Sequence, residues 1–312
     1  MLSRTADNLF WTARYVERAD FLARILDSAT RFSSLPASQD ADNTWDSVIA
    51  TAGAAHLFYG KHPKATEQTV RDFLAFDADN PSSIRSCLEI ARANGRAVRT
   101  ALTTEMWEPI NDAWHELQKI EPDKMSHEDF VRFLEWVEHV TLVFDGSARR
   151  TMLRNDAYWF LRLGGAIERA DNTARILDVK YHLLLPAREQ VGGGLDFFQW
   201  TTILREVSAL TAYHWVYRDR VKPWLVADLL ILNGQMPRSL KSCYDVIAQH
   251  VDLLAEAYGK RGASQRLAQS IRSRLAASNM EAIFQSGLHE FITAFLADNG
   301  AMGAAIAEQY LV

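Results

Sequence analysis

The sequence predicts an all-α protein built from two duplicated helical-bundle halves. Three observations support this prediction: a charged motif occurs twice, apolar residues recur at helical spacing, and the alternation typical of strands is nearly absent. The few prolines and glycines fall between the periodic segments. We expect repeats at residues 1–150 and 151–312, related by an approximate two-fold axis and packed through the repeated helices.

The duplication is clearest where residues 17–27 (ERADFLARILD) recur as residues 168–178 (ERADNTARILD). Nine of the eleven positions are identical at an offset of 151. Two further blocks follow in the same order, at offsets of 155 and 156: Trp45 matches Trp200, and residues 73–87 match residues 229–243. Three blocks in one order indicate an internal duplication.

The predicted helices follow from apolar periodicity and from breaker residues. In chain order they are 4–33, 43–59, 65–77, 82–119, 127–151, 156–185, 195–217, 220–232, 238–259, 262–277 and 280–310. Ser126 followed by Asp129 predicts a capping box for helix 127–151. Pro109 is expected to kink or split helix 82–119. Other breaks are expected at Pro36, Pro63, Pro186 and Pro237.

Composition narrows the class of protein. The net charge is -5 and the Lys and Arg residues are scattered, so no footprint for nucleic acid is present. No apolar run reaches the roughly 18 residues of a membrane span, and the N-terminal stretch lacks the apolar core of a signal peptide. Two cysteines suit a reduced compartment. We therefore expect a cytoplasmic protein that binds neither nucleic acid nor membrane.

The repeated motif separates into two faces when it is placed on a helix. Arg18 falls in the apolar stripe, while Glu17, Asp20 and Arg24 share the adjoining face. The second copy has the same layout, with Arg169 in the stripe and its neighbours at Glu168, Asp171 and Arg175.

An unpaired buried charge costs several kcal/mol, so each stripe arginine needs a partner. We expect Glu17 of one half to meet Arg169 of the other, and Glu168 to meet Arg18. One interpretation of these clusters is a structural ion-pair network that fixes how the helices register. The other is a polar cleft with catalytic candidates Glu17, Arg18, Glu168 and Arg169, in which an arginine binds a carboxylate or phosphate and a glutamate acts as base. Asp20, Arg24, Asp171 and Arg175 are then the binding candidates.

Two helix starts are further binding candidates. Asn80 and Ser83 surround the helix start at Pro81, and Arg238 and Ser239 follow Pro237. Free N–H groups at a helix N-terminus favour an anion, although proline beside a capping serine is also ordinary helix initiation. The second half differs at Met236, which stands opposite Asn80.

Cofactor and metal sites are not predicted. The run Gly192-Gly193-Gly194 lacks the preceding strand and the following Lys-Ser/Thr of a phosphate-binding loop, and is interpreted as a flexible joint. A di-iron bundle needs paired Glu-x-x-His motifs, which are absent from the sequence.

These motifs together resemble the bacterial Alpha-E family, over essentially the whole chain. The resemblance rests on Glu17-Arg18 with Asp20 and Arg24, on their repetition, and on three further blocks: Asn80-Pro81-Ser82-Ser83-Ile84, Ala91-Arg92-Ala93-Asn94, and Met106-Trp107-Glu108 with Asn111. It implies that the protein is encoded beside, or fused to, circularly permuted ATP-grasp-type ligases and transglutaminase-like proteins. It further implies a part in forming or processing amide bonds on peptides.

We therefore expect a non-catalytic accessory protein that works with an ATP-grasp-type ligase, and that binds this partner or an anionic, carboxylate-bearing peptide in a groove between the repeats. A transglutaminase-like protein is a second expected partner, and homo-oligomerisation is compatible with the sequence. The alternatives are an enzyme that uses the Glu-Arg pairs for acid/base chemistry and a purely structural scaffold.

Overall fold

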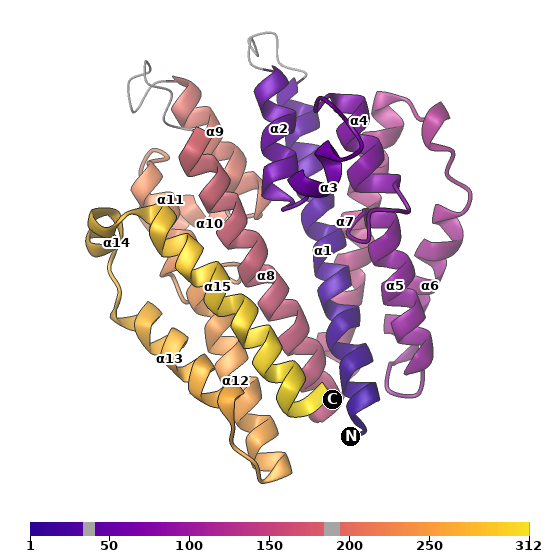
Figure 1. The fold of residues 1–312 in the computed structure, drawn as a ribbon, viewed down its shortest axis with the longest axis vertical. Helices are drawn as coiled ribbons and strands as arrows, with labels where there is room; N and C mark the ends of the chain where they lie inside the picture. Colours follow the sequence, from indigo (N-terminus) through magenta and orange to yellow (C-terminus); the bar gives the residue numbers. More distant parts are fainter. Residues whose placement is uncertain (34–40, 184–193, 312) are drawn as a thin grey trace. The chain divides into compact units, whose positions relative to one another are not determined.

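The computed structural model describes residues 1–33, 41–183 and 194–311, and of these it describes the side chains except at 41–43, 179–183 and 194–198. Every regular element in these ranges is helical, and none is a strand, which confirms the all-α prediction (Figure 1). The breaks predicted at Pro36 and Pro186, and the joint at Gly192 and Gly193, lie outside the described residues. Among the described helices, none is long and apolar enough to cross a membrane.

The chain divides into two compact units. Unit 1 comprises Met1–Glu168 with the C-terminal residues from Tyr310, and unit 2 comprises Arg169–Gln309. The division falls inside one helix, α8, and separates two parts of the chain that are each compact. The predicted repeat boundary at 150/151 concerns homology and stays a prediction.

The elements of unit 1 are α1 (Ser3–Ser33), α2 (Ala41–Thr51), α3 (Ala55–Tyr59), α4 (Glu67–Arg71), the π-helical turn η1 (Asp72–Phe76), α5 (Ile84–Ala97), α6 (Thr104–Leu117), the 3-10 turn η2 (Pro122–Lys124), α7 (His127–Thr151) and the start of α8 (Asp156–Leu183). Unit 2 holds the rest of α8, then α9 (Gly194–Glu206), α10 (Leu210–Tyr217), α11 (Pro223–Ile231), α12 (Leu240–Tyr258), α13 (Ala263–Ala277), α14 (Met280–Ser286) and α15 (Leu288–Ile306). The π-helical turn η3 (Ala307–Leu311) begins in unit 2, and its residues from Tyr310 belong to unit 1.

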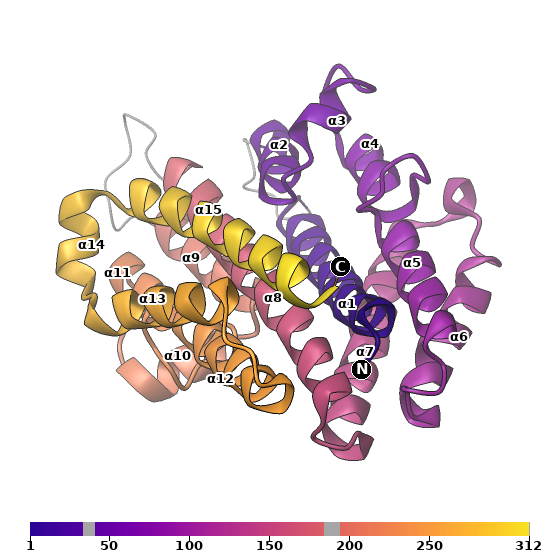
Figure 2. The ribbon, with the colours of Figure 1, turned by 60° about the horizontal axis from the view of Figure 1, so that its bottom comes forward.

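Helix α1 is the central element of unit 1. It packs along α5 and α7, and Figure 2 shows the three running side by side. Its buried residues are spread around the whole helix and include Leu9, Phe21 and Leu26 as well as the charged Glu17 and Asp20. A helix buried on all sides belongs to the core, so its charged residues must find partners inside the protein.

Unit 2 is held together around α12, which packs against α13, while α13 packs against α15. The Tyr244 ring of α12 meets the Phe295 ring of α15 edge-on at 5.4 Å. The Tyr244 hydroxyl donates to Asn299 Oδ1 at 3.0 Å, so this buried phenol is satisfied.

The prediction for α7 is confirmed at both ends. The helix spans His127–Thr151, and Ser126 and Asp129 form the expected capping box. The helix is not split at Pro109, because this proline lies inside α6, which continues past it to Leu117 and loses one hydrogen bond there; the predicted kink stays a prediction. The break falls at residues 98–103 instead. There the chain reverses so that Leu102 and Trp107 approach Gly95, which carries no side chain to block them.

Three other predicted helices are split by residues with positive φ. Helix 43–59 is interrupted at Gly53 (φ 66°), helix 195–217 at Ser208 (φ 54°), and helix 280–310 at Gly287 (φ 96°). The first two breaks have the same hydrogen bonds. Ala54 N donates to Ile49 O and Gly53 N to Ala50 O, as Ala209 N donates to Leu204 O and Ser208 N to Arg205 O. This is the Schellman pattern of a helix C-terminus, occurring twice at the sequence offset of 155.

A second turn also occurs twice, at the offset of 156. In residues 77–87, Asn80 N donates to Asp77 O, Ser83 N to Asn80 O, and Cys87 N to Ser83 O. In residues 233–243, the equivalent bonds join Met236 to Asn233, Ser239 to Met236, and Cys243 to Ser239. The backbone conformation is thus preserved although Met236 stands where the first block has Asn80.

Candidate functional site

The first candidate site lies in unit 1, where the N-terminal half of α8 approaches α1. Arg14 and Arg18 are four residues apart on α1, so their side chains project from one face of the helix. Glu168 projects from α8 toward them. The close approach is possible because Gly164 lies against the backbone of Phe10, where a Cβ atom would come within 2.1 Å of the Phe10 carbonyl oxygen.

Glu168 is held by both arginines. Arg18 Nε donates to Glu168 Oε1 at 2.6 Å, and Arg14 Nε donates to Glu168 Oε2 at 2.7 Å. Arg18 Nη1 also donates to Ser82 Oγ at 3.2 Å, which links α1 to the turn before α5. The predicted contact between Arg18 and Glu168 is therefore confirmed.

The exposure of these groups is uneven. The Glu168 side chain is only 3% exposed, whereas Arg14 and Arg18 are 18% and 23% exposed. Arg14 stacks over the Trp11 ring at 4.7 Å, and Arg18 lies 5.4 Å from the Tyr15 ring. The carboxylate is thus sealed within the protein, and the aromatic faces order the cations that cover it.

Electrostatics keep Glu168 ionised. Burial alone would raise the pKa of this carboxyl, but the charges and hydrogen bonds of Arg18 and Arg14 outweigh burial and lower the pKa below its ordinary value. Burial likewise opposes the charge of Arg18, yet Glu168 raises the pKa of this guanidinium above its ordinary value. Glu168 and Arg18 therefore both stay charged near neutral pH.

Cys87 lies near this cluster but is not an activated nucleophile. Its side chain is fully buried, and burial raises the pKa of the thiol to about 12, although the charge of Arg18 opposes the shift. A reactive cysteine requires the opposite, a thiolate stabilised by a nearby cation in a partly exposed position.

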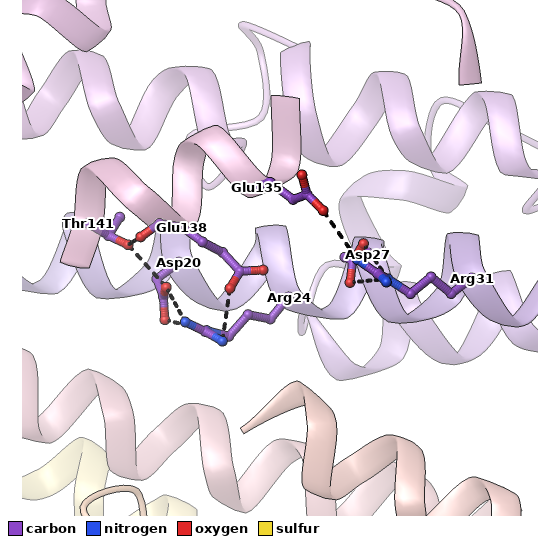
Figure 3. Close-up of polar contacts among 7 residues, drawn as sticks. All are labelled: Asp20, Arg24, Asp27, Arg31, Glu135, Glu138 and Thr141. Carbon is purple, nitrogen blue, oxygen red and sulfur yellow. Dashed lines mark hydrogen bonds and ion pairs between the residues drawn. The ribbon is translucent and has the colours of Figure 1, made fainter. Parts of the chain in front are cut away.

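The second cluster joins α1 to α7 (Figure 3). Arg24 Nε donates to Asp20 Oδ2 at 2.9 Å, and Arg24 Nη1 lies 3.0 Å from Glu138 Oε2 on α7. Thr141 Oγ1, also on α7, lies 3.0 Å from Asp20 Oδ1. Asp20 and Arg24, which were predicted to share a helix face, are both buried and form an i, i+4 ion pair that two residues of α7 extend.

Two turns further along α1, Arg31 pairs with Asp27 at 2.8 Å and reaches Glu135 of α7 at 3.5 Å. The Arg31 and Glu135 side chains are 60% and 59% exposed, so this outer link is weak. Together with the buried cluster it aligns α1 with α7 along the helix axis.

The second copy of the motif is divided between the units. Glu168 belongs to unit 1, while Arg169, Asp171 and Arg175 belong to unit 2. Arg175 Nε donates to Asp171 Oδ2 at 2.6 Å, which reproduces the pair formed by Asp20 and Arg24. Glu17 is buried in α1 of unit 1; its predicted contact with Arg169 joins residues of different units and stays a prediction.

Three of the four residues proposed at the helix starts, Asn80, Ser83 and Ser239, use their side chains for hydrogen bonds to the backbone. Asn80 is 1% exposed; its Nδ2 donates to Phe73 O at 3.0 Å and its Oδ1 accepts from Ser82 N at 3.0 Å. Ser83 and Ser239, both fully buried, are the N-caps of α5 and α12. The backbone carbonyl of Arg238 accepts a hydrogen bond from Thr173 Oγ1 at 2.8 Å.

Several members of the clusters were missed in the sequence. Arg14 could have been found, because it lies one helical turn before Arg18 on the same face. Ser82, Glu138 and Thr141 carry no comparable signal, since they reach α1 only through tertiary packing. In the described part of the chain, no three His, Cys, Asp or Glu side chains gather as they would around a metal ion.

Unit 2 carries a shallow surface depression beside α12 and α13. Its polar lining includes Asp245, Gln249, Asp252, Glu256 and Arg272. Asp245 is bound by Arg272 at 2.7 Å and by Lys241 at 3.0 Å. Burial opposes ionisation of Asp245, but these two cations lower its pKa below the ordinary value. Its carboxylate is thus committed to ion pairs within the unit.

The arrangement in unit 1 favours fixation over proton transfer. A general base must be able to accept a proton near neutral pH, and it needs a lone pair directed at the substrate. Both Glu168 oxygens accept charged hydrogen bonds, and its pKa is lowered. The side chains of Arg14 and Arg18 are the part of this cluster that remains partly exposed to solvent.

Comparison with known proteins places the chain in a family. The Alpha-E family, described as a predicted alpha-helical domain with a conserved ER motif, matches residues 1–311. Curated relatives include an uncharacterised protein of Mycobacterium bovis, 25% identical, and one of Mycobacterium tuberculosis, 24% identical, with 94% of this chain covered in each case. The chain spans about a third of the length of these relatives (35%). No solved structure gives a significant match. The helical structure and the Glu-Arg motif agree with that description, and the chain belongs to the Alpha-E family.

Proposed function

We propose that this protein is a non-catalytic accessory protein that works with an ATP-grasp-type, amide-bond-forming ligase in peptide synthesis or modification. It binds the ligase or its anionic, carboxylate-bearing peptide substrate. The observation that carries the non-catalytic part is the sequestration of Glu168: both carboxylate oxygens are bound by arginine, and the side chain is 3% exposed. A carboxylate in that state serves as a structural anion.

The ligase is proposed from the resemblance to the Alpha-E family and is supported by the length of the relatives. In the mycobacterial proteins the matching region is 35% of a longer chain, so the domain is joined there to further sequence. Physical linkage to other domains is expected of an accessory module. A transglutaminase-like protein is proposed as a second partner on the same grounds. Because an ATP-dependent ligase works where ATP is present, we place the complex in the cytoplasm.

The proposal includes an origin by duplication, with two homologous halves related by an approximate two-fold axis. Support comes from the two turns that recur with the same hydrogen bonds at offsets of 155 and 156, and from the matched pairs Asp20–Arg24 and Asp171–Arg175. Glu17 paired with Arg169 would complete the symmetry. The test is a crystal structure of the whole chain, in which residues 1–150 are superposed on residues 151–312. A rotation far from 180° in that superposition would refute the two-fold axis.

The proposed function is tested with the purified chain and the purified ATP-grasp-type ligase of the same cell. We expect a complex by isothermal titration calorimetry, and faster ATP-dependent ligation of a carboxylate-bearing peptide when the chain is added to the ligase. The chain alone should leave the peptide unchanged. Failure of the two proteins to associate at micromolar concentration, or conversion of the peptide by the chain alone, would refute the proposal.

A glutamate variant separates the accessory role from catalysis. Glu168→Gln removes a potential base but keeps the shape of the side chain, so the fraction that stays folded should still stimulate the ligase. Glu128→Gln on the exposed start of α7 is the matched control for the change in charge. Loss of all stimulation by folded Glu168→Gln, with Glu128→Gln unaffected, would favour the enzyme alternative.

A further inference from the structure

Helix α10 and the segment that leads from it to α11 carry exposed aromatic and cationic side chains in unit 2. The Trp215 side chain is 78% exposed and Trp224 is 49% exposed. Arg218 and Arg220 lie between them in sequence and are also exposed. Exposed tryptophan beside arginine is the composition typical of binding hot spots.

The guanidinium groups of Arg218 and Arg220 are available for an ion pair with a ligand. In the described part of the chain, no carboxylate lies within ion-pair distance of either guanidinium, whereas Lys222 is already paired with Asp219. The chain as a whole carries a net charge of -5, so this segment differs in sign from the average surface. An unpaired guanidinium presents a planar fork that binds a carboxylate bidentately.

The segment is rigidly held by Tyr213. The Tyr213 hydroxyl donates to Arg220 O at 2.6 Å and accepts from Lys222 N at 3.1 Å. Val221 is buried, and Lys222 is in an extended conformation, so Arg220 and Lys222 face away from the core. The backbone from which Arg220 projects is therefore fixed before any ligand arrives, which reduces the backbone entropy lost on binding.

We propose that Trp215, Arg218, Arg220 and Trp224 form a docking surface for an acidic, extended segment of a protein partner. Carboxylates of the segment pair with Arg218 and Arg220, and its apolar side chains pack on the tryptophans.

Two other ligand classes fit these observations less well. A bilayer would need a larger apolar face, because membrane affinity follows the apolar area that is buried, and α10 exposes His214 and Arg218 beside its tryptophan. Nucleic acid would need a larger cationic footprint than two free arginines.

The inference rests on the proposed accessory function, since it specifies where a partner protein docks. Its test uses synthetic peptides, so the two can fail separately. A ligase that binds the chain while acidic peptides do not would leave the proposed function standing and refute this surface. If acidic peptides bind and the ligase does not, the surface stands and the proposed function is refuted.

The experiment measures fluorescence anisotropy of a labelled peptide of repeated Glu-Glu-Leu, titrated with the full chain. The matched peptide of repeated Gln-Gln-Leu should not bind. We expect Arg218→Gln with Arg220→Gln to weaken binding at least about tenfold. Arg261→Gln with Arg266→Gln, an equal loss of charge at exposed positions elsewhere in unit 2, should leave binding unchanged. Equal weakening by both double variants would refute the surface.

A single variant separates binding from folding. Arg218 ends α10 with φ 51°, a left-handed conformation that favours glycine. Arg218→Gly should therefore keep or raise the midpoint of thermal unfolding while it weakens peptide binding. Unchanged binding by Arg218→Gly would contradict the proposal. So would phosphatidylserine vesicles or single-stranded DNA that bind more tightly than the acidic peptide.

Discussion

At the scale of residues, the geometry around Glu168 favours the structural interpretation of the repeated motif. Glu168 and Arg18 are ionised and in direct contact, yet the geometry directs both carboxylate oxygens at arginines. Truncating one side of such a buried pair costs about 3–5 kcal/mol, whereas replacing the whole group with apolar residues is often neutral. A strong dependence of stability on Glu168 would therefore not show that Glu168 is catalytic.

The buried thiol of Cys87 gives a prediction at this scale. With a pKa of about 12, only about one thiol in ten thousand is ionised at pH 8. In a Cys243→Ser background, Cys87 should not react with a disulfide reagent such as DTNB in native buffer, and should react fully in guanidinium chloride. Stoichiometric reaction of the native protein within minutes would contradict the buried position.

The sequence predicted the partner of Arg18 because a duplicated arginine in an apolar stripe requires a duplicated acid. It did not predict that Glu168 would be shared by a second arginine, Arg14. The repeated motif begins at Glu17, so a comparison of the two copies does not include Arg14. At the offset of 151 the second half has Gly165 in place of an arginine. Glu138 and Thr141 were out of reach because their contact with Asp20 and Arg24 depends on how α7 registers against α1.

At the scale of elements, the approach of α1 to α8 within unit 1 depends on one glycine. A Cβ atom at Gly164 would come within 2.1 Å of the Phe10 carbonyl oxygen, whereas one at the neighbouring Gly165 would meet Ala13 at an ordinary 4.0 Å. Gly164→Ala should lower the free energy of unfolding by about 1–3 kcal/mol through overpacking. Gly165→Ala should raise it by up to about 1 kcal/mol, because alanine favours the helix. Chemical denaturation measures the free energy of unfolding of both variants. Equal changes in the two variants would contradict the described packing.

A second prediction concerns α8 and α15 in unit 2, which are joined by His289 Nδ1 and Asp178 Oδ1 at 2.5 Å. The hydrogen bond and charge of Asp178 raise the pKa of His289 above 6.5. A raised folded-state pKa stabilises the protein fully below the unfolded value, and this contribution is lost as the pH rises through the folded value. Asp178→Asn should thus destabilise the protein at pH 5.5 and have less effect at pH 8.5, and it should lower the pKa of His289 by NMR titration.

The control for this prediction is Asp298→Asn, which removes a carboxylate paired with an arginine, Arg274, in place of a histidine. Its effect on stability should be nearly the same at both pH values. A pKa of His289 that is identical in the wild type and in Asp178→Asn would show that the pair does not form in solution.

Helix identity was predictable and helix interruption was not. The period of apolar residues and the Ser126–Asp129 box fixed α7, because both signals are local. Ser208 ends a helix in a left-handed conformation although serine is no strong breaker, and Gly287 does so where a single glycine inside a periodic pattern is commonly tolerated. Pro109 is a strong helix breaker by residue type, yet α6 continues through it with one hydrogen bond fewer, because the packing of α6 stabilises the helix.

At the scale of the whole molecule, the two compact units and the two proposed repeats do not share a boundary. The units divide at Glu168 and Arg169, inside α8 and inside the repeated motif itself. A chain in which one motif supplies the Glu168 carboxylate to one unit and the Arg169 guanidinium to the other is difficult to separate into independent halves. We therefore expect a cut after residue 150 to yield unstable fragments, because unit 1 then loses Glu168 and leaves Arg14 and Arg18 without their anion.

The account depends most on the claim that the cluster of Arg14, Arg18 and Glu168 is a structural lock. The most direct test compares the free energies of unfolding of two proteins. One is the double variant that carries Arg14→Leu and Arg18→Leu, and the other is the triple variant that also carries Glu168→Leu. The double variant leaves a buried, unpaired carboxylate and should lose about 3–5 kcal/mol, and the triple variant should regain at least about 2 kcal/mol. The triple variant should also bind the ligase as the wild type does. A triple variant no more stable than the double, or one that folds fully but no longer binds the ligase, would contradict the account.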